Sequence, residues 1–199
     1  MEVAAYEVAG LAFMDSFACA FKALQDPKCT QLLGSLVPGA TMAFGARVPG
    51  TSYQLDPVQA AFNIGTMVSW LQVNDPALAT ASGQFADNLG AILAVADYRA
   101  RKAIAEGDSP PRVRDLLDAL IRAQELATLE WARSVHRNDA VSVTEGTHKV
   151  AGAAARCALT RIASAACSVT LLGGTRDQVA AAVAIARSEE PVTGHPGTT

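Results

Sequence analysis

Apolar residues recur at helical spacing along most of the chain. Over 8–24 they fall on two neighbouring stripes, which predicts a largely buried helix ending near Asp26-Pro27. Asp56-Pro57 supplies an N-cap acceptor and a proline at the first helical position, so a second long helix should run from there to about Val73. Further helices are predicted over 89–104, 109–135, 150–172 and 175–187.

Glycine, proline and small polar residues interrupt this helical pattern. A short helix is expected around 30–36, and the segment 38–52 should be an irregular loop with room for a short hairpin. The segment 189–199 has no apolar face and is predicted to be a disordered tail. The remaining polar segments, both predicted to be irregular, are 74–84 and 136–146.

Composition, together with the helical pattern, predicts the fold class. Half of the 199 residues are hydrophobic but only 6% are aromatic, and alanine is abundant, which favours closely packed helices over a β-sandwich. We therefore predict an all-α domain spanning 1–188. A net charge of −3 gives no basic footprint for nucleic acid. Without a basic leader or an apolar run of roughly 20 residues, we expect a cytoplasmic protein that does not cross a membrane.

The cysteine spacing does not match a metal site. The four cysteines lack any C-x-x-C arrangement, and no paired histidines accompany them. We predict free and mostly buried thiols, with no metal and no cofactor. These cysteines are Cys19, Cys29, Cys157 and Cys167.

The segment 32–71 contains four short motifs in a defined order. Its sequence is LLGSLVPGATMAFGARVPGTSYQLDPVQAAFNIGTMVSWL, in which V-P-G is followed by R-V-P-G-T, Y-x-L-D-P-V and A-A-F-x-I-G. Because the same motifs recur in this order in its members, the segment resembles the MmgE/PrpD (2-methylcitrate dehydratase) family. The similarity continues through 87–98, 113–125 and 171–186. It implies the family's helical domain, without the α/β lid domain and returning helices of longer members. Family members dehydrate 2-methylcitrate or its alkyl homologues, or decarboxylate cis-aconitate, without a metal and in a pocket between two domains.

The family's acid/base signature is altered in this chain. The pattern N-D-T-W-L-A-A-E-W-G-H-P-S-D-N-L-G is matched by NDPALATASGQFADNLG, residues 74–90, so that Asp75 and Asn88 are retained. The histidine of G-H-P is replaced by Gln84, and a second family histidine falls at Gln124. Glutamine cannot transfer a proton near neutral pH, so the resemblance leaves Asp75 as the candidate general base. The alternative for Asp75 is a purely structural role at a helix junction.

Two arginines occupy further family positions in the helix predicted over 150–172. An aspartate–histidine pair is replaced by Ala155-Arg156, and the family's lysine is matched by Arg161. A guanidinium can hold a carboxylate but cannot shuttle protons. With Arg47, these two arginines are candidates to receive an anionic substrate. The complete set of predicted substrate-binding residues is Gln84, Asn88, Gln124, Arg156 and Arg161.

Other readings of these residues remain open. Asp87 and Asn88 also suit the N-cap of the helix that begins at Leu89. The whole chain fits a dehydratase-like enzyme acting on an alkylcitrate-type polycarboxylate in secondary metabolism. It equally fits an inactive partner subunit of a full-length relative, or a repurposed cyclase that works by positioning. In each case we expect a homo-oligomer or a hetero-oligomer with such a relative, because unpaired apolar helix faces favour association.

Overall fold

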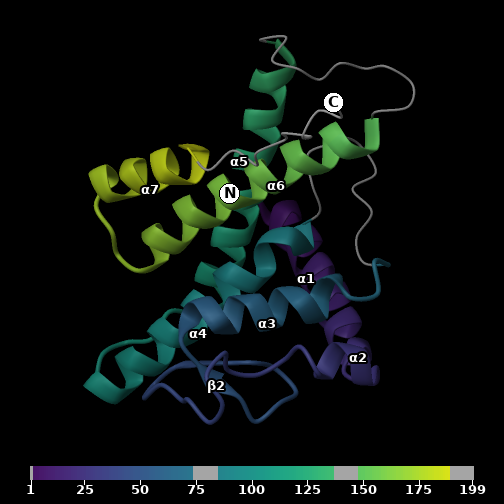
Figure 1. Cartoon of the computed structure of the whole chain (residues 1–199). Helices are drawn as coiled ribbons and strands as arrows, with labels where there is room; N and C mark the ends of the chain where they lie inside the picture. The colour runs from purple at the N-terminus through teal and green to yellow at the C-terminus, as the bar shows by residue number, and fades with distance from the viewer. Residues whose placement is uncertain (1, 74–84, 137–147, 189–199) are drawn as a thin grey trace, which may run out of the picture.

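The computed structural model describes residues 2–73, 85–136 and 148–188, and within these ranges it is almost entirely helical (Figure 1). This confirms the predicted all-α class. The only sheet in the described part is a two-stranded antiparallel hairpin in the expected loop, in which β1 (Ala46–Arg47) pairs with β2 (Gln54–Leu55). The helices are α1 (Val3–Ala23), α2 (Pro27–Thr30), α3 (Pro57–Ser69), η1 (Phe85–Asn88), α4 (Leu89–Glu106), α5 (Val113–His136), α6 (His148–Leu171) and α7 (Arg176–Ser188).

Two helix starts that the sequence predicts are confirmed by their hydrogen bonds. The Asp56 carboxylate accepts from the backbone N–H groups of Val58 and Gln59, each at 3.0 Å, and so caps α3. At α7, the Thr175 N–H donates to the Gln178 side chain at 2.8 Å, and the Gln178 N–H donates back to the Thr175 hydroxyl at 3.3 Å. Both helices therefore begin where their capping residues place them.

The helix expected over 30–36 is wrong in position, because α2 covers Pro27–Thr30 instead. The Asp26 carboxylate accepts from the Lys28 N–H at 2.9 Å, with proline at the first helical position. The other Asp26 oxygen accepts from the indole N–H of Trp70 at 2.9 Å, and this hydrogen bond holds the pKa of Asp26 below its ordinary value. The end of α3 is thereby tied to the start of α2.

Helix α5 also begins later than the sequence predicts. The Asp115 carboxylate accepts a hydrogen bond from the backbone N–H of Arg112 at 2.7 Å, and the helix starts at Val113 rather than at Ser109-Pro110. Helix α3 ends at Ser69, before the predicted end.

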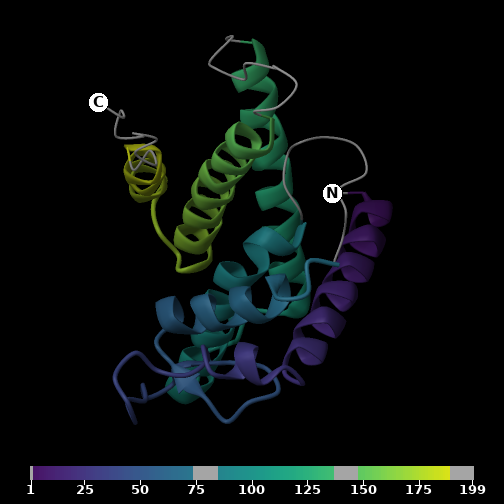
Figure 2. The ribbon, with the colours of Figure 1, turned by 45° about the vertical axis from the view of Figure 1, so that its right-hand side comes forward.

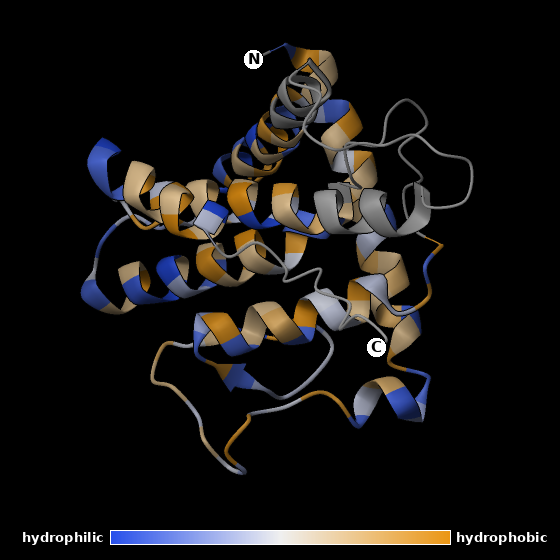
Figure 3. Ribbon diagram, turned by 45° about the horizontal axis from the view of Figure 1, so that its top comes forward, coloured by the Kyte–Doolittle hydropathy of each residue, from blue (hydrophilic) through white to orange (hydrophobic). Residues whose placement is uncertain are grey.

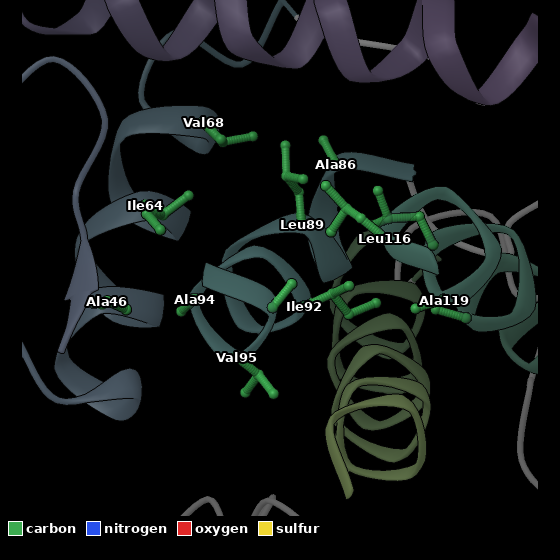
Figure 4. Close-up of a cluster of buried hydrophobic side chains, with 14 of the residues drawn as sticks. Ala46, Ile64, Val68, Ala86, Leu89, Ile92, Ala94, Val95, Leu116 and Ala119 are labelled. Carbon is green, nitrogen blue, oxygen red and sulfur yellow. The ribbon is translucent and has the colours of Figure 1, made fainter. Parts of the chain in front are cut away.

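Helices α3 and α4 pack with their backbones almost in contact. A Cβ atom added to Gly90 would lie 2.7 Å from the Ala61 carbonyl oxygen and 2.9 Å from the Gly65 nitrogen. Glycine at this crossing lets the two helix axes approach closely. Large buried side chains of α3 and α4 fill the space beside the crossing, and they include Ile64, Val68, Leu89 and Ile92. Leu116 of α5 belongs to the same buried cluster (Figure 4).

The other helices are arranged around this pair. Helix α1 packs across α3 and α5, whereas α6 contacts α4, α5 and α7. Helix α7 lies beside α6 at the edge of the molecule (Figure 2). The short helix η1 contacts α1, α3, α4, α5 and α6, so the chain enters α4 at the centre of the bundle.

The prediction that the first helix is largely buried is wrong. The residues that α1 buries are mostly small, and its large side chains Val8, Leu11 and Met14 are 67%, 64% and 60% exposed. Figure 3 shows hydrophobic residues along much of the length of the helices. By length and composition, α1 is also the one helix in the described ranges that is long and apolar enough to cross a membrane, contrary to the expectation from the sequence. The core helix of a soluble protein can pass the same test, and one side of α1 packs on α3 and α5.

All four cysteines are free thiols. Cys19, Cys29 and Cys167 are buried as predicted, whereas Cys157 is exposed. Burial raises the pKa of all three buried thiols, and that of Cys167 reaches about 11.

Replacing Gly90 with alanine tests the close helix crossing. The added methyl group would meet the backbone of α3, which cannot move aside as a flexible side chain would. We therefore expect the free energy of unfolding to fall by about 2 kcal/mol. Gly65→Ala is the matched control, because its Cβ would meet nothing within 4 Å and alanine favours a helix by up to about 1 kcal/mol. Urea denaturation measures the free energy of unfolding of both variants. Equal values for the two would contradict the close approach of α3 and α4 at Gly90.

Candidate functional site

The candidate site is built around the junction of η1 with α6. Asn88, the last residue of η1, is only 3% exposed, and its side-chain oxygen accepts a hydrogen bond from the Ser164 hydroxyl of α6 at 2.9 Å. Asn88 also occupies the N-cap position of α4, but its side chain makes no capping hydrogen bond there. The predicted capping role of the Asn88 side chain is therefore wrong. Its side-chain oxygen instead joins two helices that are distant in sequence.

Arg161 lies on the same face of α6 as Ser164. The two residues are one helical turn apart, so their side chains leave the helix on the side that meets η1. The Arg161 side chain is partly buried, and its Nε atom is enclosed. A partly desolvated guanidinium interacts with a carboxylate more strongly than an exposed one does. One of the predicted anion-binding residues, Arg161, thus lies one helical turn from Ser164, the hydrogen-bond partner of Asn88.

Gln124 lies in a different hollow. It lines an apolar groove of about 750 Å³ between α1 and α5, where Ala5, Val8 and Ile121 are among its neighbours. The polar groups of this groove are at Gln124, Glu125 and Thr128 on α5. Gln124 therefore faces α1 in the described structure, and its predicted contact with a substrate stays a prediction.

Three predicted site residues lie wholly or partly outside the described structure. Asp75 and Gln84 belong to the segment 74–84, which is outside the described residues. Arg156 belongs to α6, but its side chain is outside the described part. The roles assigned to these three residues from the sequence remain predictions.

Arg47 does not join this group. Its Nη2 atom lies 2.6 Å from Asp97 Oδ1 on α4, and its backbone N–H donates to the other carboxylate oxygen at 2.8 Å. This hydrogen-bonded carboxylate raises the pKa of Arg47. Asp97 is nine residues beyond Asn88, or roughly 13 Å along α4 at 1.5 Å per residue. Arg47 therefore holds the hairpin against α4 through Asp97, contrary to the prediction that it belongs to a shared anion site.

Three described side chains at the η1–α6 junction, those of Asn88, Ser164 and Arg161, are suited to binding an anion rather than to transferring protons. Asn88 and Ser164 are neutral hydrogen-bonding groups, and the guanidinium of Arg161 stays charged. Within the described residues, no three His, Cys, Asp or Glu side chains gather where they could hold a metal ion. Ser164 was missed by the sequence analysis, although its position one turn after Arg161 was a signal that both face the same way.

Comparison with known proteins agrees with this fold. The profile of the MmgE/PrpD N-terminal domain matches residues 1–193. The 2-methylcitrate dehydratases of Salmonella typhimurium and Cupriavidus necator are 40% and 41% identical to this chain over 92% of its length. A 2-methylcitrate dehydratase-like protein of Aspergillus oryzae is 33% identical over 97% of it. The chain spans 35% of each of the two bacterial relatives and 36% of the fungal one. This chain therefore belongs to the MmgE/PrpD family and contains that family's N-terminal domain.

Proposed function

We propose that this chain forms the helical wall of a dehydratase-type site that binds an alkylcitrate-like polycarboxylate. The observation that carries the proposal is the 40% identity to a 2-methylcitrate dehydratase over 92% of the chain. The partly buried Arg161 beside the Asn88–Ser164 hydrogen bond supports it, because a polycarboxylate needs a fixed cation. The similarity to a dehydratase-like protein of Aspergillus oryzae is compatible with a role in secondary metabolism.

The chemistry assigns different tasks to the site residues. Removing water from a tertiary alcohol requires a base for the carbon-bound proton, an acid for the departing hydroxyl group and donors for the carboxylates. We assign the base to Asp75 and a carboxylate to Arg161. The remaining predicted contacts to the substrate are those of Gln84, Asn88, Gln124 and Arg156.

A second candidate function is a non-catalytic partner subunit of a full-length relative. Glutamines occupy the positions that resemble family histidines, Gln84 and Gln124, and so remove two imidazoles from the site. The exposed apolar side chains of α1 offer a surface for such an assembly. A cyclase that works by positioning its substrate is a third candidate, and the apolar groove beside Gln124 is the feature that favours it.

Turnover of an alkylcitrate by the purified chain tests the enzyme proposal. We expect 2-methylcitrate or a longer alkylcitrate to lose one water molecule, as measured by mass spectrometry, and Asp75→Asn to abolish that product because an amide cannot accept the proton. Asp108→Asn is the matched control, since Asp108 is an exposed residue in the turn after α4. Full turnover by Asp75→Asn would refute the assignment of the base. Absence of turnover in the wild type, with co-purification of a full-length relative, would favour the partner function.

Binding of the polycarboxylate can be tested separately from turnover. We expect Arg161→Gln to weaken the binding of 2-methylcitrate about tenfold, since one charge-assisted hydrogen bond is lost, and Arg161→Lys to weaken it less. Isothermal titration calorimetry measures the affinity. Arg176→Gln, an exposed arginine at the start of α7, should leave the affinity unchanged. An Arg161→Gln variant that binds as tightly as the wild type would remove Arg161 from the site.

A further inference from the structure

A second hollow lies on the opposite side of α5 from the groove at Gln124. It has a volume of about 910 Å³, is open to solvent on one side, and is lined by residues of α5, α6, α7, the turn that precedes α5 and Arg99 of α4. Ala119, Arg122 and Leu126 line it at helical spacing. Small-molecule sites in proteins usually measure roughly 300–1,000 Å³, so this cavity is large enough for a ligand of substantial size.

One side of the cavity is apolar. Val179 and Val183, one turn apart on α7, face Ala166 of α6 and Leu126 of α5 across the hollow. Such a wall excludes water and favours an alkyl or aryl group of a ligand.

The acidic side chains of the cavity already accept hydrogen bonds from the protein. Asp115 accepts from the backbone N–H of Arg112, and Asp118 accepts from the hydroxyl of Tyr6 on α1. Arg114, whose guanidinium lies 4.8 Å from the centre of the Tyr6 ring, adds positive charge near both carboxylates. Both carboxylates therefore have hydrogen-bond donors of the protein before any ligand binds.

The basic side chains are less fully compensated. Arg99 donates to the Leu171 carbonyl oxygen at the end of α6. Arg122 forms no salt bridge with any carboxylate of the described residues. Its charge does reach Cys167 on α6, where it opposes the larger effect of burial on the pKa of that thiol. Arg122 is an exposed side chain that lines the hollow, so it offers a solvent-accessible cation beside the apolar wall.

We propose that the cavity between α5, α6 and α7 binds an amphipathic carboxylate, with its carboxylate on Arg122 and its apolar chain against Val179 and Val183. A guanidinium forms charge-assisted hydrogen bonds with a carboxylate, and the apolar wall removes the chain from water. This site is separate from the η1–α6 junction and from the proposed dehydratase chemistry. Arg161 and Asn88 are not among its lining residues.

Decanoate, 1-decanol and acetate are the probes that test the two parts of this proposal. Decanoate has both a carboxylate and an alkyl chain, 1-decanol has the chain without the charge, and acetate has the carboxylate without the chain. We expect decanoate to bind more tightly than either of the others in isothermal titration calorimetry. Asp75→Asn should leave decanoate binding unchanged, so failure of the proposed dehydratase activity would leave this site standing. Equal binding of acetate or of 1-decanol would overturn the proposal.

Cys167 provides an independent readout because it lines the cavity and is only 5% exposed. In a Cys157→Ser background, which removes the exposed thiol, bound decanoate should slow the alkylation of Cys167 by N-ethylmaleimide, as measured by peptide mass spectrometry. Alkylation of Cys29, which is buried elsewhere and does not line the cavity, should not change. Equal protection of both cysteines, or protection of neither, would contradict binding in this cavity.

Substitution of Arg122 tests the carboxylate contact. Because one charge-assisted interaction is lost, Arg122→Gln should weaken decanoate binding about tenfold and leave 1-decanol binding unchanged. Arg176→Gln is the matched control, since this exposed arginine does not line the cavity. An unchanged preference of Arg122→Gln for decanoate over 1-decanol would overturn the role of Arg122. The alkylation of Cys167 is measured in the Cys157→Ser variant, so its result does not depend on whether Arg122→Gln folds.

Discussion

The close contact between α3 and α4 fixes the positions of the other elements. Gly90 brings the backbone of α4 against Ala61 and Gly65 of α3, and η1 directly precedes α4 in the chain. The axis of α4 therefore determines where Asn88 lies, and the hydrogen bond from Ser164 brings α6 to the same point. A shift of α4 away from α3 would move Asn88 as well. The position of Asn88 relative to Ser164 therefore depends on Gly90, which has no reactive side chain.

Helix α5 separates two environments that the sequence places side by side. Arg122 and Gln124 are only two residues apart, yet an α-helix turns by about 200° over two residues. Gln124 consequently faces the groove with α1, and Arg122 faces the cavity with α6 and α7. The family resemblance drew attention to Gln124 because glutamine stands there in place of a histidine. It gave no reason to consider Arg122, because the proposed role of Arg122 depends on the packing of α6 and α7 beside α5 in the folded structure.

The sequence predicted correctly those features that depend on interactions between residues close together in the chain. The caps of α3 and α7 were predictable because Asp56, Thr175 and Gln178 bond to backbone groups within three residues. Asn88 has equally good capping chemistry, but its oxygen binds Ser164, 76 residues away. The exposure of α1 was also misjudged, since an apolar pattern shows that a face favours burial without showing what covers it.

The exchange of imidazoles for amides and guanidinium groups has a consequence for pH dependence. Amides and hydroxyl groups, such as those of Asn88 and Ser164, stay neutral between about pH 5 and pH 9, and guanidinium groups in general stay charged there. A family site that retains its histidines changes charge within this interval. The part of polycarboxylate binding that depends on such groups should then follow the ionisation of the polycarboxylate itself, and any bell-shaped rate profile would require other, titrating groups. The substitutions thus separate substrate recognition, which a permanent cation can maintain, from proton transfer, which it cannot.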